Sequence, residues 1–228
     1  LPAPEGEERT NNTPRRFRWT LSAMRAIRQS CASGQARRGR GMAGISRTGW
    51  LVAAALVALL AAILLGMGRP PICPCGTISL WHGTVQSNQN SQQISDWYSF
   101  SHVIHGFIFY GVLRWIMPER PLWVPLAIAI GIEGAWEILE NSPIIIDRYR
   151  EVTMAFGYSG DSVLNSVSDT LFMILGFIAA SRMRWWVTTL LAIVFELFTL
   201  WTIRDNLTLN VLMLVSPVEA IKEWQAAP

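Results

Sequence analysis

An uncharged apolar block over residues 50–67 most constrains what this chain can fold into. About 20 such residues are what a helix needs to cross the hydrocarbon core of a bilayer. A helix that is apolar on every face has no side to present to water, so a soluble domain has no use for this segment. No small-residue cleavage site follows it, which favours a retained membrane anchor over a signal peptide.

Four further apolar blocks follow, at residues 100–117, 122–139, 163–180 and 185–203. Each is long enough to be a membrane span. A sixth run, residues 207–218, is too short to cross unaided and contains Pro217, which favours an interfacial or re-entrant helix. The sequence therefore predicts an all-α polytopic transmembrane bundle of about five spans, with a C-terminal interfacial or re-entrant helix.

Residues 1–41 differ from the rest of the chain because they hold nine arginines against Glu5, Glu7 and Glu8. Their Pro, Ser, Gly and Arg content cannot bury a core, which predicts a disordered basic tail. Two interpretations stay open: an over-long gene start with the natural initiator at Met42, or a basic segment attracted to anionic lipid. Residues 42–228 are expected to form a single transmembrane helical domain.

Basic residues in short loops mark the cytoplasmic side of a membrane protein. With five spans, the basic tail shares one side with the arginines of the second and fourth connections, Arg114, Arg120, Arg182 and Arg184. The N-terminus is therefore expected in the cytoplasm. The opposite side receives the polar loop 68–97, the segment 141–160 and the C-terminus.

Ionisable groups inside spans are costly, so each one is a candidate functional residue. Three spans carry polar groups on one helix face, at spacings of three or four residues. In chain order these groups are His102 and His105; Glu133, Glu137 and Glu140; and Asp161, Asn165 and Asp169. Because successive spans run in opposite directions, the three sets meet near the non-cytoplasmic surface, with Glu133 and Asp169 deeper. The pattern predicts a polar cavity there.

Two chemistries suit such a cavity, and the spacing does not choose between them. Histidine with carboxylates can bind a divalent metal cofactor, for which the candidate ligands are His102, His105, Glu137 and Asp161. Alternatively, closely spaced carboxylates push one pKa upward and a nearby histidine becomes a general acid or base. The candidate catalytic residues are His102, His105, Glu137, Glu140, Asp161, Asn165 and Asp169.

Structural roles compete with these functional ones. Asp161 can be the N-cap of the fourth span, since a helix-end aspartate is most often a cap. Arg204 and Asp205 reach the same level at the end of the fifth span, and Glu196 lies deeper. Cys73-Pro-Cys75 can bind a soft metal with Met67 or His82, form a disulfide, or remain two thiols.

The motifs DWYSFSHVIHGFIFY, EGAWEILENSPIIIDRYRE and GYSGDSVLNSVSDT resemble an uncharacterised bacterial inner-membrane family, a domain of unknown function of the UPF type. The resemblance covers nearly everything from Cys73 to Gln225. It implies a multi-pass protein of the inner membrane, and the family carries no established activity.

More distantly, the order of a histidine, a glutamate, a loop arginine and an Asp-x-x-x-Asn helix start is similar to VanZ-like membrane proteins. The Asp-Lys that precedes the VanZ-like histidine is absent here. The corresponding residues are His105, Glu137 or Glu140, Arg148 or Arg150, Asp161 and Asn165. That resemblance implies a cell-envelope theme and makes Arg148 and Arg150 candidates for substrate binding. Arg204 and Asp205, which reach the same level, are further candidates for substrate binding.

We therefore expect an inner-membrane protein that recognises, or also processes, a lipid-linked or amphipathic envelope molecule in its periplasmic cavity. The rival is a non-catalytic accessory subunit of a membrane complex, whose polar residues join helices. A proton or ion path would need polar groups through the full membrane depth, whereas only Glu133, Asp169 and Glu196 go deep. The expected partners are the lipid bilayer, an amphipathic ligand or another membrane protein, and no nucleic acid.

Reporter fusions test this orientation. A fusion at Pro118 should report the cytoplasm, and fusions at Gly157 and Pro228 should report the outside, because arginine-rich short loops stay inside. Paired reporters that are active on opposite sides of the membrane provide the measurement. A cytoplasmic signal from Gly157 would contradict the gathering of the three polar sets on one side.

Overall fold

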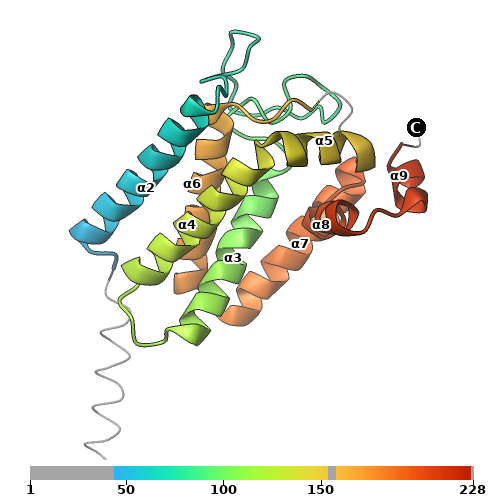
Figure 1. Ribbon diagram of the computed structural model, residues 1–228. Coiled ribbons are helices and arrows are strands. Elements are labelled where there is room, and N and C mark those ends of the chain that lie inside the picture. The colour runs from blue at the N-terminus through green and yellow to red at the C-terminus, as the bar shows by residue number, and fades with distance from the viewer. Residues whose placement is uncertain (1–43, 154–157, 227–228) are drawn as a thin grey trace, which may run out of the picture. The chain divides into compact units, whose positions relative to one another are not determined.

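The computed structural model describes residues 44–153 and 158–226, which fold into eight α-helices and no strand (Figure 1). The expected tail, residues 1–41, lies outside the described residues. The helices are α2 (Arg47–Gly66), α3 (Ser99–Ile116), α4 (Trp123–Glu140), α5 (Pro143–Val152), α6 (Val163–Arg182), α7 (Trp185–Ile203), α8 (Leu207–Val215) and α9 (Glu219–Ala226). The predicted all-α class is confirmed.

Five of these helices, α2, α3, α4, α6 and α7, coincide with the five apolar blocks. By length and composition, α2, α6 and α7 could each cross a membrane. The other two are only slightly shorter, at 18 residues each. They are more polar because α3 contains two histidines and α4 contains three glutamates, and these are the residues from which the predicted cavity is built.

Two segments differ from the sequence expectation. The connection over residues 141–160 contains a helix, α5, which begins at Pro143, a position that suits proline because its missing N–H would be unpaired there in any case. The C-terminal run expected as one helix over residues 207–218 ends at Val215 as α8, and α9 follows. Pro217 separates the two because its ring excludes a continuous helix.

The closest helix contact is between α3 and α6, and two glycines permit it. A Cβ on Gly106 would lie 2.2 Å from the carbonyl oxygen of Met173, and one on Gly176 would lie 2.2 Å from that of Val103. Small residues let helix backbones approach in this way. Since His102 precedes Gly106 by one helical turn, the contact brings the polar start of α3 beside the polar start of α6.

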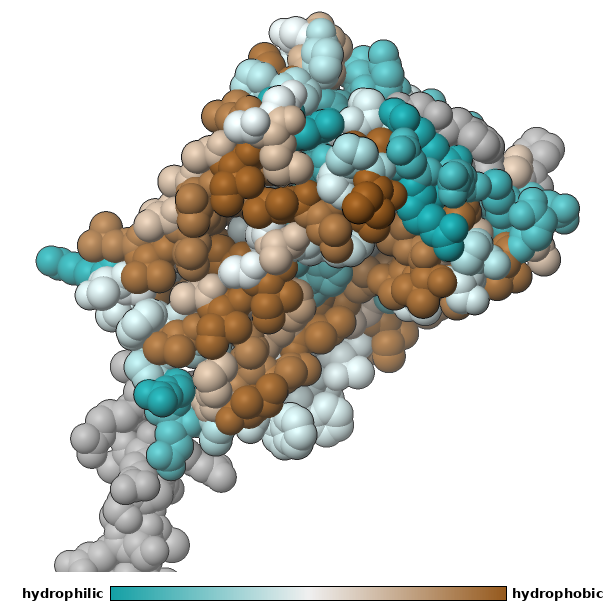
Figure 2. All heavy atoms as spheres, in the orientation of Figure 1, coloured by the Kyte–Doolittle hydropathy of each residue, from teal (hydrophilic) through white to brown (hydrophobic). Residues whose placement is uncertain are grey.

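An apolar core fills the bundle between α2, α3, α4 and α6. Its buried members are Ala53, Leu113, Leu126, Ala129, Ile130, Met173, Ile174 and Phe177. The outer faces of the helices are also apolar, and large side chains such as Leu51, Leu175 and Trp201 are more than half exposed. Figure 2 shows this apolar surface along the helices, with hydrophilic residues gathered at the ends of the bundle.

The loop between α2 and α3 folds over the start of α6. The N–H groups of Val163 and Leu164 donate to the carbonyls of Pro70 and Pro71, at 2.8 and 3.1 Å. The first N–H groups of a helix have no partner inside it, so the loop satisfies donors that would otherwise be left unpaired. It also closes this end of the bundle, as the upper part of Figure 1 shows.

Replacing Gly106 with alanine tests the α3–α6 contact. The free energy of unfolding should fall by roughly 1–3 kcal/mol, because the added methyl group cannot fit without moving one helix. Thermal unfolding in detergent measures the change. Gly111→Ala on the same helix is the matched control, since a Cβ there meets nothing within 4 Å. Equal melting temperatures for the two variants would contradict the close packing.

Candidate functional site

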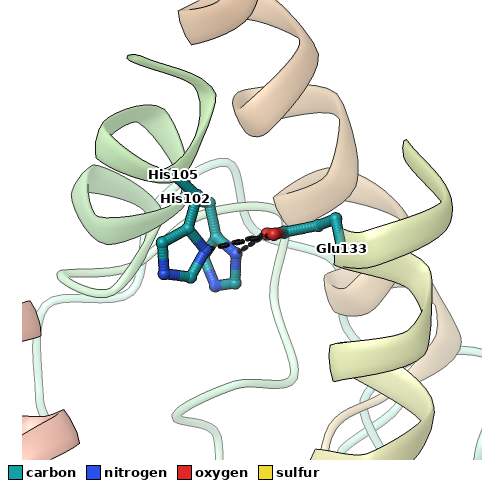
Figure 3. A group of neighbouring side chains, drawn as sticks. All are labelled: His102, His105 and Glu133. Atoms are coloured by element: carbon teal, nitrogen blue, oxygen red, sulfur yellow. Dashed lines mark hydrogen bonds and ion pairs between the residues drawn. The ribbon is translucent and has the colours of Figure 1, made fainter. Parts of the chain in front are cut away.

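Histidines of α3 and a glutamate of α4 form the centre of the polar cluster (Figure 3). The Nδ1 atom of His102 lies 2.5 Å from Oε1 of Glu133, and Nδ1 of His105 lies 3.1 Å from Oε2 of the same carboxylate. An ionised carboxylate only accepts hydrogen bonds, so both imidazoles donate to it through Nδ1. Each ring is therefore left with Nε2 as its acceptor nitrogen.

A second carboxylate, Glu137, lies one turn further along α4. Its Oε1 atom is 3.7 Å from Nδ1 of His102, which is too long for a hydrogen bond. The residue is 1% exposed, and neither of its carboxylate oxygens has a hydrogen-bond partner among the described residues. Burying a carboxylate without partners is costly, so this group calls for a ligand or another source of compensation.

Asp161 is not the N-cap of α6. That role belongs to Ser162, whose Oγ accepts a 3.1 Å hydrogen bond from the N–H of Asn165. The Asp161 carboxylate instead accepts hydrogen bonds from the hydroxyl of Tyr158, at 2.8 Å, and from the side-chain amide of Asn141, at 3.0 Å. The capping interpretation is therefore wrong, and Asp161 belongs to the polar cluster.

Arg69, just after α2, holds the segment that leads to Asp161. Its guanidinium donates to the carbonyl oxygens of Ser159, at 2.7 Å, and of Asp161, at 3.0 Å. Gly160 between them has φ of +84°, and a Cβ there would lie 2.6 Å from the guanidinium. Only glycine combines this backbone conformation with that close approach.

A cavity of about 170 Å³ opens beside the cluster. Six of the seven candidate catalytic residues line it, and the seventh, Glu137, is buried in contact with the same groups. The polar part of the wall consists of Asn90, Ser91, Tyr98, Ser101, His102, His105, Glu140, Tyr149, Thr153, Tyr158, Asp161, Asn165, Asp169 and Asn210. Trp136, Leu207 and Val211 supply an apolar part.

The candidate substrate-binding arginines do not line this cavity. Arg148 and Arg150 donate to the carbonyl oxygens of Leu214, at 3.2 Å, and Tyr158, at 2.6 Å. Arg204 donates to a carbonyl oxygen in α9 at 3.3 Å. In the structure these side chains hold α5, α8 and α9 around the cavity instead of forming its wall.

Asp205 and Glu196 also serve the surrounding framework. Asp205 accepts a 3.1 Å hydrogen bond from the hydroxyl of Tyr98, which does line the cavity. Glu196 accepts hydrogen bonds from the N–H groups of Leu207 and Thr208, at 3.0 and 3.1 Å, and so caps the start of α8.

Sequence reasoning identified Asn165 but not the tyrosines of the site or the amides of Asn141 and Asn210. Tyr149 donates a 2.9 Å hydrogen bond to Asn210, and Asn141 accepts one of 2.7 Å from the N–H of Asp161. Glu133 was assigned by its spacing to the polar face of its helix but was not among the candidate catalytic residues, although it accepts hydrogen bonds from both histidines. The partners of the tyrosines come from distant segments, so the sequence gives no signal for them.

Three groups of side chains place metal-ligating atoms within 4.8 Å of one another. They are His102, His105 and Glu133; His102, Glu137 and Asp169; and Glu137, Glu140 and Asp161. In the first group, the two histidines already donate hydrogen bonds directly to the glutamate. The four candidate metal ligands of the sequence analysis are divided among these groups and do not form one site. Cys73 and Cys75 form a disulfide, which leaves no free thiol there for a metal.

Burial raises the pKa of three carboxyl groups that lie outside the long helices, those of Asp96, Asp161 and Asp205. The pKa values of Asp161 and Asp205 are both raised to about 6, and the hydrogen bonds that they accept only partly oppose this effect. A carboxyl group with a raised pKa binds its proton more tightly in the folded protein than in the unfolded chain. Stability is therefore highest below pH 4 for this contribution and is lost as the pH rises through 6.

This sign gives a testable pH dependence. Between pH 4 and pH 7 the parent should lose stability relative to Asp161→Asn, by at most roughly 3 kcal/mol at about 1.4 kcal/mol per pKa unit. Thermal unfolding in detergent across this range provides the measurement. Asp147→Asn is the control, because that side chain is 67% exposed. A parent and an Asp161→Asn variant with parallel pH profiles would contradict the raised pKa.

Comparison with known proteins identifies the family. The family model described as protein of unknown function (DUF2585) matches residues 64–227. A UPF0314 protein of Sphingopyxis alaskensis is 92% identical over 183 residues, which cover 80% of this chain and 97% of that one. UPF0314 proteins of Novosphingobium aromaticivorans and Agrobacterium fabrum are 64% and 56% identical, over 72% and 77% of this chain and 85% and 89% of theirs.

No solved structure matches the chain significantly. The family match nevertheless spans every element that builds the cavity, from the end of α2 to α9. With this match and with relatives of such identity, the chain belongs to the DUF2585 family, whose curated members carry the name UPF0314.

Proposed function

We propose that this protein is a multi-pass protein of the bacterial inner membrane that recognises an amphipathic, lipid-linked envelope molecule in its polar cavity. The observation that carries the proposal is the cavity itself. Polar side chains from α3, α4 and α6 converge on it from segments that are distant in sequence, and an apolar strip borders them. Mixed walls of this kind suit a ligand with a polar head and an apolar tail.

The membrane part of the proposal rests on the surface of the helices. Three helices are long and apolar enough to span, and α3 and α4 pack among them with their polar residues turned inward. Exposed apolar side chains along the bundle would contact lipid. With five spans, the start of α2 and the end of α7 would lie on opposite sides of the membrane.

The periplasmic placement of the cavity rests on charge. Arg114 and Arg120, and likewise Arg182 at the end of α6, lie at the helix ends opposite to His102 and Asp161. Arginines in short connections favour the cytoplasm. The cavity would therefore open toward the outer leaflet, where the head group of an envelope lipid lies.

Recognition accounts for the site better than helix association alone. Polar groups that only join helices would be satisfied by one another across the interface. Here the Glu137 carboxylate has no hydrogen-bond partner among the described residues, and the cavity lined by its neighbours His102 and Asp169 is not filled by protein. These two features favour a bound molecule over the alternative of a purely structural subunit.

Processing of the bound molecule is compatible with the same wall. His105 and Asp161 both line the cavity, and an imidazole near a carboxyl group can transfer protons to and from a ligand. The proposal of recognition does not depend on such a step.

Blocking the cavity tests the proposal. Protein extracted in a mild detergent should carry a bound amphiphile that native mass spectrometry and analysis of the lipid extract detect. Ser101→Phe, in the cavity wall, should weaken binding of the amphiphile about 5- to 150-fold, because overpacking opposes binding by about 1–3 kcal/mol.

The matched control is Ile108→Phe on the same helix, where the side chain is 48% exposed on the outer surface. It should retain the amphiphile like the parent. A parent without any specific amphiphile, or equal retention by both variants, would count against recognition in this cavity.

A further inference from the structure

The carboxylate of Glu137 is the least explained group in the molecule. It is almost fully buried, and both of its oxygens lack a hydrogen-bond partner among the described residues. Side chains of three helices surround it, so the carboxylate points into the protein and not toward the outer surface of the bundle. A group in this state needs a positive charge or donors nearby.

The side chains around Glu137 do not supply enough positive charge. Glu133, Glu137 and Asp169 are all at most 4% exposed, and within the described ranges only His102 and His105 come within ion-pair distance of them. Arg69, which holds the segment that leads to Asp161, donates to backbone carbonyls instead. When all three carboxyl groups are ionised, two imidazoles balance at most two of them, and at least one negative charge is left without a counter-charge.

The separations in this group fit a shared cation better than direct pairing. His102 Nε2 lies 3.7 Å from Asp169 Oδ2. The 3.7 Å contact of Glu137 Oε1 is with Nδ1, the nitrogen that faces Glu133, and the three residues offer one ligand atom each within 4.8 Å of one another. Both contacts are longer than a hydrogen bond. Two ligands that each lie about 2.1 Å from one tetrahedral metal ion are themselves about 3.4 Å apart, close to the spacing observed.

The neighbouring hydrogen bonds orient two of the three groups toward a common point. Glu133 accepts from Nδ1 of His102, which leaves the Nε2 lone pair free and directed at Asp169. Ser99 Oγ lies 3.3 Å from Oδ1 of Asp169, so Oδ2 is the oxygen left facing the histidine. Ligating histidines commonly donate their other nitrogen to a carboxylate in this way.

We propose that His102, Glu137 and Asp169 bind one divalent first-row transition cation, of the Zn²⁺ or Mn²⁺ type. One imidazole with two carboxylates suits these ions better than Mg²⁺ or Ca²⁺, which prefer oxygen ligands alone. His102 and Asp169 also line the cavity, so an open coordination position would face a bound ligand. The site goes beyond the proposed recognition function and does not rest on it.

Metal titration of the full chain tests this inference. Protein purified in detergent, stripped with a chelator and dialysed, is titrated separately with Zn²⁺ and Mn²⁺, and equilibrium dialysis with elemental analysis measures the bound ion. One equivalent should bind, and the melting temperature should rise with ion concentration. Glu137→Gln and Asp169→Asn, which keep the side-chain shape, should each weaken binding at least about tenfold.

Glu196→Gln is the matched control, since that carboxylate caps α8 and lies outside the group. It should bind one equivalent with the affinity of the parent, even if it melts earlier. Absence of saturable binding of either ion to the parent would overturn the proposal, and this result does not depend on any variant folding. Parent-like binding by folded Glu137→Gln and Asp169→Asn, checked by circular dichroism, would overturn the ligand assignment.

Discussion

The close approach of α3 to α6 places the groups on which the site depends. Gly106 and Gly176 let the two backbones meet, and one turn away the contact sets His102 of α3 opposite Asp169 of α6. Helix α4 then brings Glu133 and Glu137 to the same histidine. A larger side chain at either glycine would separate the helices, and the geometry of the whole cluster would change with that separation.

Buried acidic groups are the main electrostatic cost of this arrangement, and the protein compensates them in two ways. Around Asp161, a tyrosine hydroxyl and the amide of Asn141 donate hydrogen bonds, while Arg69 holds the backbone beside it. Around Glu133, two histidines donate. Among the described residues, Glu137 receives a hydrogen bond neither from a hydroxyl or amide group nor from a histidine. This unpaired carboxylate is the reason why both proposals, the cation and the bound ligand, concern this part of the protein.

The framework around the cavity explains why several charged residues near the site do not enter it. Arg148, Arg150 and Arg204 each donate to a backbone carbonyl, and Glu196 caps α8. These contacts hold the C-terminal helices against α5 and α7 and so complete the wall that contains Asn210 and Val211. The charged residues at these helix ends therefore hold neighbouring segments in place and do not form the wall of the cavity.

The amino-acid sequence alone was enough to predict the five long helices and the polar residues that converge on the cavity. Apolar block length predicts α2, α3, α4, α6 and α7, and spacings of three or four residues place each polar set on one face. The pairing of atoms could be read only from the folded chain: Ser162 caps α6, Glu133 accepts from both histidines, and Glu137 has no hydrogen-bond partner among the described residues. Helical periodicity shows only on which face of its own helix a residue lies. The pairings also depend on the distances between helices and on the paths of the loops, and residues far apart in the chain determine both.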